Sequence, residues 1–517
     1  MIIQGRSAQR WPLFLIGLFS MLAGRSQDLP SGTPPFIRDS LDAYISRGLK
    51  DWQVPGLAVV VVKDGRVVLM KGYGVRDIET KKTVDAGTLF MIASNTKLFT
   101  GCSLAMLDEQ GKISLDDPIT KYFPEFRLYD STSTGLVSIR DLLCHRIGTK
   151  TYEGDFTFWN TALTREEIMH RMRYLKPVYP FRQVYGYCNS CFLTAGQVIP
   201  VVTGTSWEEF VQSHFLTPLG MNQSRVLSTG IASQANVATP YTTSYTGNLE
   251  KVPYDNWNNM APAASIVSNV QDLSHWLMMQ LDSGRYEGKQ IISWKSLAKT
   301  RWANTWISSI LSPTLPMHFR GYGLGLVTND YVGRQIFYHT GGAGGMVSNV
   351  CFVPEEKLGI AILTNNDNQN FFEALRYQIL DAYLGQPYVN RSLQRLPDHL
   401  ESDQKTLAAI RGWKSRLHKE RPVMPLSAYA GEYRNTLYGK IRITVEADHL
   451  LIRFETKPDL SATLEYMGND EWLLTYNNIL YGIFSTRFEI SGEKVTAVTT
   501  KENPFVEEDP YRFEKVN

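Results

Sequence analysis

The sequence is poor in cysteine, has no block of like charge and has no low-complexity segment. Five cysteines in 517 residues are too few to form a disulfide framework for a chain of this size. The 53 basic and 51 acidic residues leave a formal net charge of +2, which argues against nucleic acid as a partner. The nine histidines show no H-E-x-x-H motif and no paired ligand spacing, so we expect no metal ion and no cofactor. A globular chain with room for two or three domains remains.

The N-terminal region has the pattern of an export signal. Two arginines precede an apolar run at residues 11–23, and small residues follow this run. The order predicts a signal peptide over residues 1–26 and a secreted protein, with the periplasm as the expected compartment. An uncleaved anchor is the alternative. No later segment approaches the roughly 20 apolar residues that a spanning helix needs, so we expect no stable membrane span after signal removal.

Residues 36–385 show strands first, then helices, then strands again. Two β-rich runs, 57–62 and 67–70, are joined by Asp64-Gly65, which is a strong hairpin signal. Apolar residues at helical spacing follow over 97–110, 166–174 and 206–215. Further strands are expected at 321–327, 335–339, 347–353 and 358–364, with a helix at 371–384. This order predicts an α+β domain whose sheet is built from both ends of the domain.

The last part of the chain has a different pattern. Residues 386–424 are charged and helical and are interpreted as a connector. Short strands are then expected at 441–445, 450–454, 472–476, 488–490 and 495–498. Strands of this length and spacing predict a small all-β domain, a barrel or a sandwich, over residues 425–517.

Ser94-Asn95-Thr96-Lys97 is one of four S-x-x-K tetrapeptides, the others beginning at Ser296, Ser402 and Ser491. Only Ser94 follows an apolar stretch and opens a predicted helix, so Ser94 and Lys97 face the same direction, one turn apart. A helix N-terminus also favours negative charge. Because a serine hydroxyl needs a base to become a nucleophile, a partly desolvated lysine at this spacing predicts a nucleophile and its activator.

Two further motifs could complete such a site. Tyr187-Cys188-Asn189 is a Y-x-N that lies in the helical region, in a turn before an apolar run. Y-x-N also occurs in the connector and the β-rich tail, at Tyr388, Tyr433 and Tyr476. His339-Thr340-Gly341-Gly342 follows a predicted strand, and glycines at a strand end let a substrate approach the backbone. A free N–H group there could stabilise an oxyanion.

The order S-x-x-K, Y-x-N, H-T-G resembles the serine β-lactamase and penicillin-binding peptidase superfamily, in its class C-like branch. The resemblance covers about residues 36 to 385 and includes Leu142-Leu143-Cys144-His145-Arg146-Ile147-Gly148, which is similar to the family's L-L-x-H-x-x-G turn. It implies an antiparallel sheet with a helical subdomain. The β-rich tail resembles the lipocalin-like domains that accompany some members.

The resemblance also implies a role for each site residue. Ser94 would be the acylated nucleophile, Lys97 its activator, and Tyr187 the group that passes the proton to the leaving group. Asn189 would orient Lys97 or the substrate, and His339, Thr340 and Gly341 would line the substrate site. The backbone N–H groups of Ser94 and Gly342 would form the oxyanion hole. His145 is interpreted as a residue that fixes a turn rather than as a base.

The implied function is a secreted serine hydrolase that acts on a small peptide, ester or lactam. His339 replaces the lysine usual in this family, and an ordinary histidine titrates near pH 6.5. A permanent charge for the substrate carboxylate is therefore missing, which favours a D-amino-acid-type peptidase or esterase over a β-lactamase. Peptidoglycan is a possible partner.

Two alternatives belong to other classes of protein. A non-catalytic penicillin- or peptidoglycan-binding sensor would have the same fold without turnover. A thiol redox protein could use Cys188 and Cys191, which form a C-x-x-C. The strand-to-helix context of a redox motif is missing, but a disulfide between these two cysteines remains open.

Overall fold

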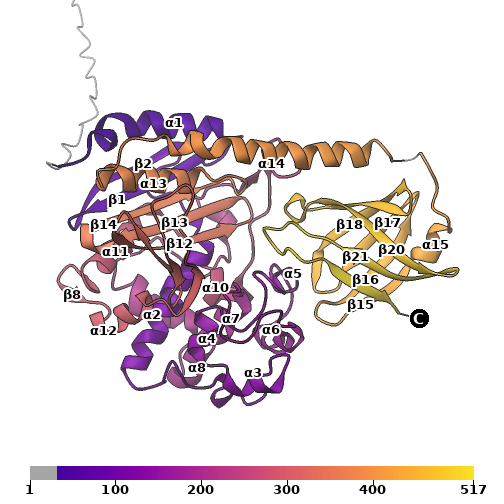
Figure 1. Ribbon diagram of the computed structural model, residues 1–517, viewed down its shortest axis with the longest axis horizontal. Coiled ribbons are helices and arrows are strands. Elements are labelled where there is room, and N and C mark those ends of the chain that lie inside the picture. The colour runs from indigo at the N-terminus through magenta and orange to yellow at the C-terminus, as the bar shows by residue number, and fades with distance from the viewer. Residues whose placement is uncertain (1–31, 418, 517) are drawn as a thin grey trace, which may run out of the picture.

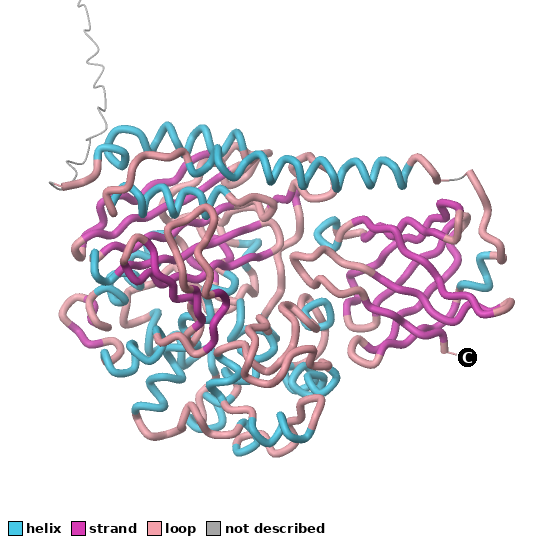
Figure 2. Tube along the Cα trace, in the orientation of Figure 1, coloured by secondary structure: helices cyan, strands magenta, loops and turns pink. Residues whose placement is uncertain are grey.

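An antiparallel sheet of eight strands forms the centre of the larger domain in the computed structural model, which describes residues 32–417 and 419–516. The strand order is β2-β1-β14-β13-β12-β11-β10-β9 (Figures 1 and 2). The strands are β1 (Gly56–Lys63), β2 (Arg66–Gly74), β9 (Thr305–Ser308), β10 (Arg320–Tyr322), β11 (Val327–Tyr331), β12 (Arg334–Ala343), β13 (Met346–Val353) and β14 (Leu358–Thr364). The predicted signal peptide lies outside the described residues.

The first hairpin shows how the sequence determines this sheet. Asp64 and Gly65 have φ values of 52° and 72°, the left-handed conformation that a tight two-residue hairpin turn requires. The run Gly56–Val62 is apolar and buried, because β1 pairs with β2 on one edge and with β14 on the other and α11 packs against it. The sheet is therefore built from both ends of the domain, as predicted.

Helices cover both faces of the sheet (Figure 1). The helix α13 (Phe371–Tyr383) packs on β13 and β14 and contacts α1 (Leu41–Asp51), whereas α11 (Val270–Leu281) packs on β1 and β14 from the other face. The remaining helices of this domain are α2 (Thr96–Glu109), α3 (Ser131–Leu136), α4 (Ile139–Leu143), α5 (Asp155–Phe158), α6 (Arg165–Arg171), α7 (Asn189–Gly196), α8 (Val198–Thr203), α9 (Trp207–Val211), α10 (Ala261–Ala264) and α12 (Trp294–Arg301). Most of these helices form a subdomain, and in the sequence they lie between β2 and β9.

A long helix, α14 (Arg391–Lys414), leads from the larger domain to a barrel (Figure 1). After the short α15 (Leu426–Tyr429), eight antiparallel strands close into this barrel because β15 also pairs with β22. The strands are β15 (Gly431–Asn435), β16 (Gly439–Glu446), β17 (His449–Phe454), β18 (Lys457–Gly468), β19 (Glu471–Tyr476), β20 (Ile483–Ser491), β21 (Lys494–Thr500) and β22 (Tyr511–Lys515). The α+β domain with an all-β barrel is the predicted fold class.

Two strand predictions need correction. The single strand expected at 321–327 is divided into β10 and β11, because the turn between them packs against α2. A Cβ on Gly325 would lie 2.3 Å from the carbonyl oxygen of Lys97. The H-T-G-G segment, expected at a strand end, lies inside β12, and the turn follows at Gly344-Gly345. Of the strands in the large sheet and the barrel, β9, β15, β18 and β22 were not predicted.

Among the described residues, none of the helices combines the length and the hydropathy needed to cross a bilayer.

Candidate active site

Ser94 lies where a strained turn enters α2. A short 3₁₀ turn, η2 (Ala93–Asn95), precedes the helix, and Ala93 has a φ of 48°. Such a conformation is uncommon for a residue with a Cβ and is found preferentially at functional sites. Within residues 88–105, every residue except Ser94 is buried. The local backbone therefore presents the Ser94 side chain to a cavity while the surrounding segment is held in the core.

Lys97 lies one turn after Ser94, and its Nζ is 3.0 Å from Ser94 Oγ. Lys97 also donates to Asn189 Oδ1 at 2.6 Å and to the carbonyl oxygen of Ala263 at 2.9 Å. The side chain is fully buried, and burial lowers the pKa of Lys97 to about 7. The ring centroids of Tyr187 and Phe192 lie 4.8 and 5.3 Å from Nζ.

The partners of Lys97 determine the direction of its lone pair. Asn189 Oδ1 and the Ala263 carbonyl can only accept hydrogen bonds. A neutral amine has two N–H groups, which these two acceptors occupy. Its lone pair is then left for the hydroxyl proton of Ser94. This arrangement is suited to removing a proton from Ser94.

Asn189 is itself oriented by a carboxyl group that the sequence analysis missed. Asn189 Nδ2 donates to Asp155 Oδ2 at 2.6 Å, which assigns Oδ1 to the Lys97 side. Asp155 begins α5 and is buried, and burial raises its pKa well above the usual range. No motif marks Asp155, which lies in the sequence between the S-x-x-K and the Y-x-N.

Tyr187 packs beside Ser94 and Lys97. Burial raises the pKa of Tyr187 well above 10, and its hydrogen bond with Ser94 opposes this shift only in part. The phenol therefore remains protonated at neutral pH. It can donate its proton only if it takes up another proton in return. The ring of His145 lies 4.2 Å from that of Tyr187, and His145 Nδ1 accepts the N–H of Cys188 at 3.0 Å. His145 thus holds the Y-x-N turn, in agreement with its interpretation.

His339 is neutral in this structure. Its Nε2 lies 2.8 Å from the hydroxyl of Tyr322, and its Nδ1 lies 2.7 Å from the carbonyl of Thr340. Because a carbonyl only accepts, Nδ1 carries the proton and Nε2 accepts from Tyr322. Burial, with the nearby charge of Lys97, lowers the pKa of His339 to about 3. At neutral pH the ring therefore carries no charge for a substrate carboxylate.

The next residues of β12 form an open strand edge. The pairing of β12 with β11 ends at Tyr338, whereas its pairing with β13 continues to Ala343. A Cβ on Gly341 would lie 2.0 Å from the carbonyl oxygen of Ile92, so only glycine fits between β12 and the turn before Ser94. Gly342 follows on the edge strand. The oxyanion role of the Ser94 and Gly342 N–H groups stays a prediction.

A cavity of about 370 Å³ joins these groups. Its lining includes Ser94, Tyr187, Asn189, His339, Thr340 and Gly342 but not Lys97 or Gly341. The lining also includes aromatic side chains that no sequence motif marks, namely Tyr152, Trp159, Tyr185, Tyr322, Tyr338, Phe372 and Phe505. Arg320 lines the cavity as well, and its buried Nε has no hydrogen-bond partner among the described residues. The structure therefore brings the three motifs together around one small aromatic cavity.

The structure gives less support to thiol redox chemistry and to metal binding. All five cysteines carry free, buried thiols, so Cys188 and Cys191 are not bridged. Cys188 Sγ lies 3.2 Å from Ser190 Oγ. Within the described part of the chain, His, Cys, Asp and Glu side chains form no group of three or more that could hold a metal ion.

Comparisons with known proteins find a family, a second domain and similar sequences. Residues 41–384 match the family model described as Beta-lactamase, and residues 415–515 match a domain of unknown function, DUF3471. The chain is 27% identical over 432 residues to the unguisins hydrolase ungD of Aspergillus violaceofuscus, which covers 78% of this chain and 76% of that protein. It is 27% identical over 353 residues to Protein flp of Staphylococcus aureus (strain MW2), covering 66% and 67%.

A solved structure shares the fold. The octameric penicillin-binding protein homologue from Pyrococcus abyssi aligns with a TM-score of 0.60 and 24% sequence identity. The alignment covers 92% of this chain and 99% of that one. The likeness therefore extends beyond the larger domain.

Proposed function

The chain belongs to the beta-lactamase family, and on this premise we propose that it is a serine hydrolase that cleaves an amide or an ester through an acyl-enzyme on Ser94. One observation carries the proposal. The partners of Lys97 leave its lone pair for the Ser94 hydroxyl, 3.0 Å away. A lysine with a pKa of about 7 is neutral often enough at physiological pH to act as a base.

The proposed reaction has two halves. Lys97 takes the proton as Ser94 Oγ attacks the carbonyl carbon, and the N–H groups of Ser94 and Gly342 stabilise the oxyanion. Tyr187 then supplies a proton to the departing amine or alcohol and recovers one from Lys97. Water attacks the acyl-enzyme with the same groups acting in reverse. Asn189 and Asp155 keep Lys97 oriented throughout.

We further propose a D-amino-acid-type peptide or a small ester as the substrate, with a β-lactam as the alternative. The neutral His339, with both nitrogens engaged, offers no charge to a lactam carboxylate. Arg320 lines the cavity and could hold a terminal carboxylate from another direction. A similar protein is named for the hydrolysis of unguisins, which supports a hydrolytic reaction.

Labelling of the nucleophile tests the reaction class. A fluorescent serine-directed phosphonate should add once to the wild-type protein, and peptide mapping should place the adduct on Ser94. Ser94→Ala should abolish both labelling and turnover. Ser402→Ala is the matched control because Ser402 begins an exposed S-x-x-K on α14, and it should keep both. An adduct on another serine or on a cysteine would refute the assignment.

A substrate panel tests the specificity. D-alanine amides, D-Ala-D-Ala peptides, p-nitrophenyl esters and a chromogenic cephalosporin should be turned over with the cephalosporin last. If Arg320 binds a carboxylate, Arg320→Gln should raise KM for a free peptide acid and leave KM for the corresponding peptide amide unchanged. Acylation of Ser94 without release of product would instead favour the binding or sensor alternative.

Export and peptidoglycan as the natural substrate also belong to this proposal. The pattern in residues 1–26 supports export. Cell fractionation with an antibody to the barrel, and release of D-alanine from purified peptidoglycan fragments, test the two points separately.

A further inference from the structure

The loop that joins β21 to β22, residues 501–510, reaches from the barrel to the cavity of Ser94. Phe505 lines this cavity. Its ring lies against the backbone of β12, since a Cβ placed on Gly342 would be 2.5 Å from Phe505 Cζ. The ring also meets Trp159, with the two centroids 6.1 Å apart. A side chain of the barrel therefore forms part of the cavity wall beside the predicted oxyanion hole.

The loop is held in this position by its own hydrogen bonds. Asn503 N donates to the carbonyl of Tyr481 at 3.0 Å, and Asn503 Nδ2 donates to the carbonyl of Leu480 at 3.0 Å. Asn503 Oδ1 accepts the N–H of Phe505 at 3.1 Å. Phe505 is therefore fixed to the barrel and not merely resting on the larger domain.

Glu507, two residues further on, joins the barrel to α5. Its two carboxylate oxygens accept the backbone N–H groups of Gly154 at 2.9 Å and of Phe156 at 3.0 Å. Tyr511 of β22 donates to the same carboxylate at 2.8 Å. The two backbone donors flank Asp155, so Glu507 determines where that residue lies.

Asp155 connects this contact to the catalytic lysine. Its carboxyl accepts from Asn189, whose other amide atom accepts from Lys97. Three successive contacts therefore lead from Glu507 to Nζ of Lys97. A shift of α5 would be transmitted to the position of the base.

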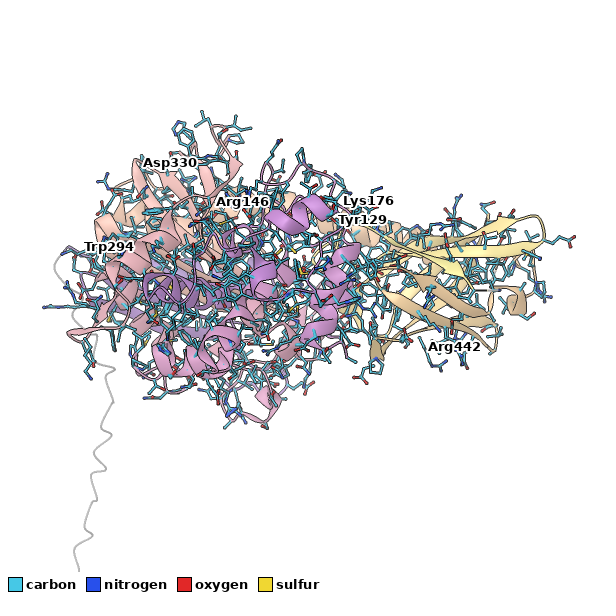
Figure 3. The ribbon with its side chains drawn as sticks, turned by 90° about the horizontal axis from the view of Figure 1, so that it is seen from below. Tyr129, Arg146, Lys176, Trp294, Asp330 and Arg442 are labelled. Atoms are coloured by element: carbon cyan, nitrogen blue, oxygen red, sulfur yellow. The ribbon has the colours of Figure 1, made fainter. Side chains whose placement is uncertain are left out.

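The barrel lies beside the larger domain (Figure 3), and aromatic contacts, such as those of Phe156 with Tyr438 and Tyr511, join the two together with hydrogen bonds. The carbonyl of Thr456 accepts from Ala162 N at 2.8 Å and from Thr161 Oγ1 at 3.0 Å. Other contacts between the two domains are Arg171 Nη1 to the Leu437 carbonyl at 2.6 Å, Lys150 to Asp509 at 2.7 Å, and buried Lys457 to the Trp159 carbonyl. Contacts on several sides of the loop fix the barrel against the cavity.

We propose, resting on the proposed function, that the barrel is a working part of the active site. Phe505 is a specificity-determining residue that limits the size of the substrate group beside Gly342. Glu507 is a positioning residue for Lys97 that acts through α5. The substrate class is thereby narrowed to amides and esters with a small group on that side.

The effect of Phe505 follows from its place in a small cavity. A rigid aromatic ring against the strand edge excludes a branched or long substituent there, and discrimination by pocket size is worth roughly tenfold to a hundredfold. Phe505→Ala removes this ring and opens the wall. The kcat/KM for bulky substrates should therefore rise relative to that for small ones.

The test uses the full chain and two substrate series. One series varies the acyl group, p-nitrophenyl acetate against hexanoate, and the other varies the leaving group, D-alanine amide against D-alanine p-nitroanilide. In Phe505→Ala, the bulky-to-small ratio of kcat/KM should rise roughly tenfold or more in the series whose varied group lies beside Gly342. Phe319→Ala, at an exposed phenylalanine outside the cavity, should leave both ratios unchanged.

The outcomes separate this inference from the proposed function. Unchanged ratios in both series, with phosphonate still labelling Ser94, would overturn the role of Phe505 and leave the hydrolase proposal standing. Loss of labelling in the wild-type protein would refute the hydrolase proposal itself.

Glu507 is tested with Glu507→Gln, which keeps the size of the side chain but replaces one of its two acceptor oxygens with an NH2 group that cannot accept a backbone N–H. If Glu507 positions the base, kcat should fall roughly tenfold and the acid limb of the pH profile should move to higher pH, because a looser Lys97 is better hydrated. Glu508→Gln, at the exposed neighbour, is the control and should change neither. Circular dichroism and phosphonate labelling establish that the variant is folded. An unmoved acid limb in a folded Glu507→Gln protein would overturn the positioning role.

Discussion

Two buried lysines, one in each domain, have nearly the same environment and different partners. Burial lowers the pKa of both Lys97 and Lys457 to about 7. Each ammonium group lies between two aromatic rings, at 4.8 and 5.3 Å for Lys97 and at 5.3 and 5.6 Å for Lys457. Lys97 has the hydroxyl of Ser94 within 3.0 Å. The hydrogen bond described for Lys457 goes to a backbone carbonyl, that of Trp159.

The comparison teaches that a lowered lysine pKa reports burial and not chemistry. What distinguishes Lys97 is the pair of acceptors that leave its lone pair for a nucleophile. Lys457 lies instead near the carboxyl groups of Asp255 and Glu502, where it links the barrel to the larger domain. The variants below separate the two roles.

The largest difference is expected on removal of each lysine. Lys97→Ala should lower kcat/KM by about 10³-fold, since a positioned general base contributes about 10² to 10⁴. The kcat/KM of Lys457→Met should stay within about tenfold of the wild-type value, because Lys457 takes no part in proton transfer. Ester hydrolysis measured on both folded variants decides the point. A Lys97→Ala protein with near wild-type turnover would show that another group is the base.

A smaller effect is expected from the tyrosines that lie against the two lysines. Tyr187→Phe should lower kcat by about 10²-fold, and its combination with Lys97→Ala should be far from additive because the two groups share a proton path. Tyr481→Phe, against Lys457, should leave kcat unchanged. Additive losses for Tyr187 and Lys97 in steady-state kinetics would mean that they act in separate steps.

The pH dependence of turnover should reflect the titration of Lys97 and not that of Lys457. Lys97 acts as a base in its neutral form, which predominates above its pKa of about 7. The rate should therefore fall below pH 7, by about tenfold per pH unit, and level off above it. Lys457→Met should give the same acid limb. An acid limb that moves in this variant would implicate Lys457 in the reaction.

The smallest effect is on stability. A lysine has a pKa near 10.4 in the unfolded chain, so between pH 7 and 10 the unfolded chain holds a proton that folded Lys457 does not. The wild-type free energy of unfolding thus gains about 1.4 kcal/mol per pH unit from this residue. Relative to the wild type, Lys457→Met should lose stability by that amount as the pH rises. Urea unfolding at several pH values measures the difference in unfolding free energy between the two proteins. A difference that stays constant with pH would show that Lys457 does not titrate in this range.

The parts of the site that local chain geometry determines could be predicted from the sequence. Ser94 and Lys97 are one helical turn apart, so their contact needs no long-range information. The Asp64-Gly65 hairpin and the strand at 358–364 were found for the same reason, since a turn signal or an apolar run is enough to mark them.

The remaining parts depend on packing between distant segments. Asp155 and Tyr322 complete hydrogen bonds to Asn189 and His339 across the larger domain, and nothing near them in sequence marks them. The low pKa of His339 is a consequence of burial, which its motif does not encode. Phe505 lies in another domain altogether, where a single phenylalanine in a loop looks unremarkable.

The pairing of β1 with β14 has a consequence for how the protein comes into existence. Leu57 pairs with Thr364, so the centre of the sheet joins segments from opposite ends of the larger domain. Contacts of such long sequence separation form late and slowly in folding. During synthesis the chain has Ser94 and Lys97 long before it has the strand that completes the sheet around them. The proposed site can therefore form only after nearly the whole larger domain has been synthesised, since the strand that completes the sheet is among its last segments.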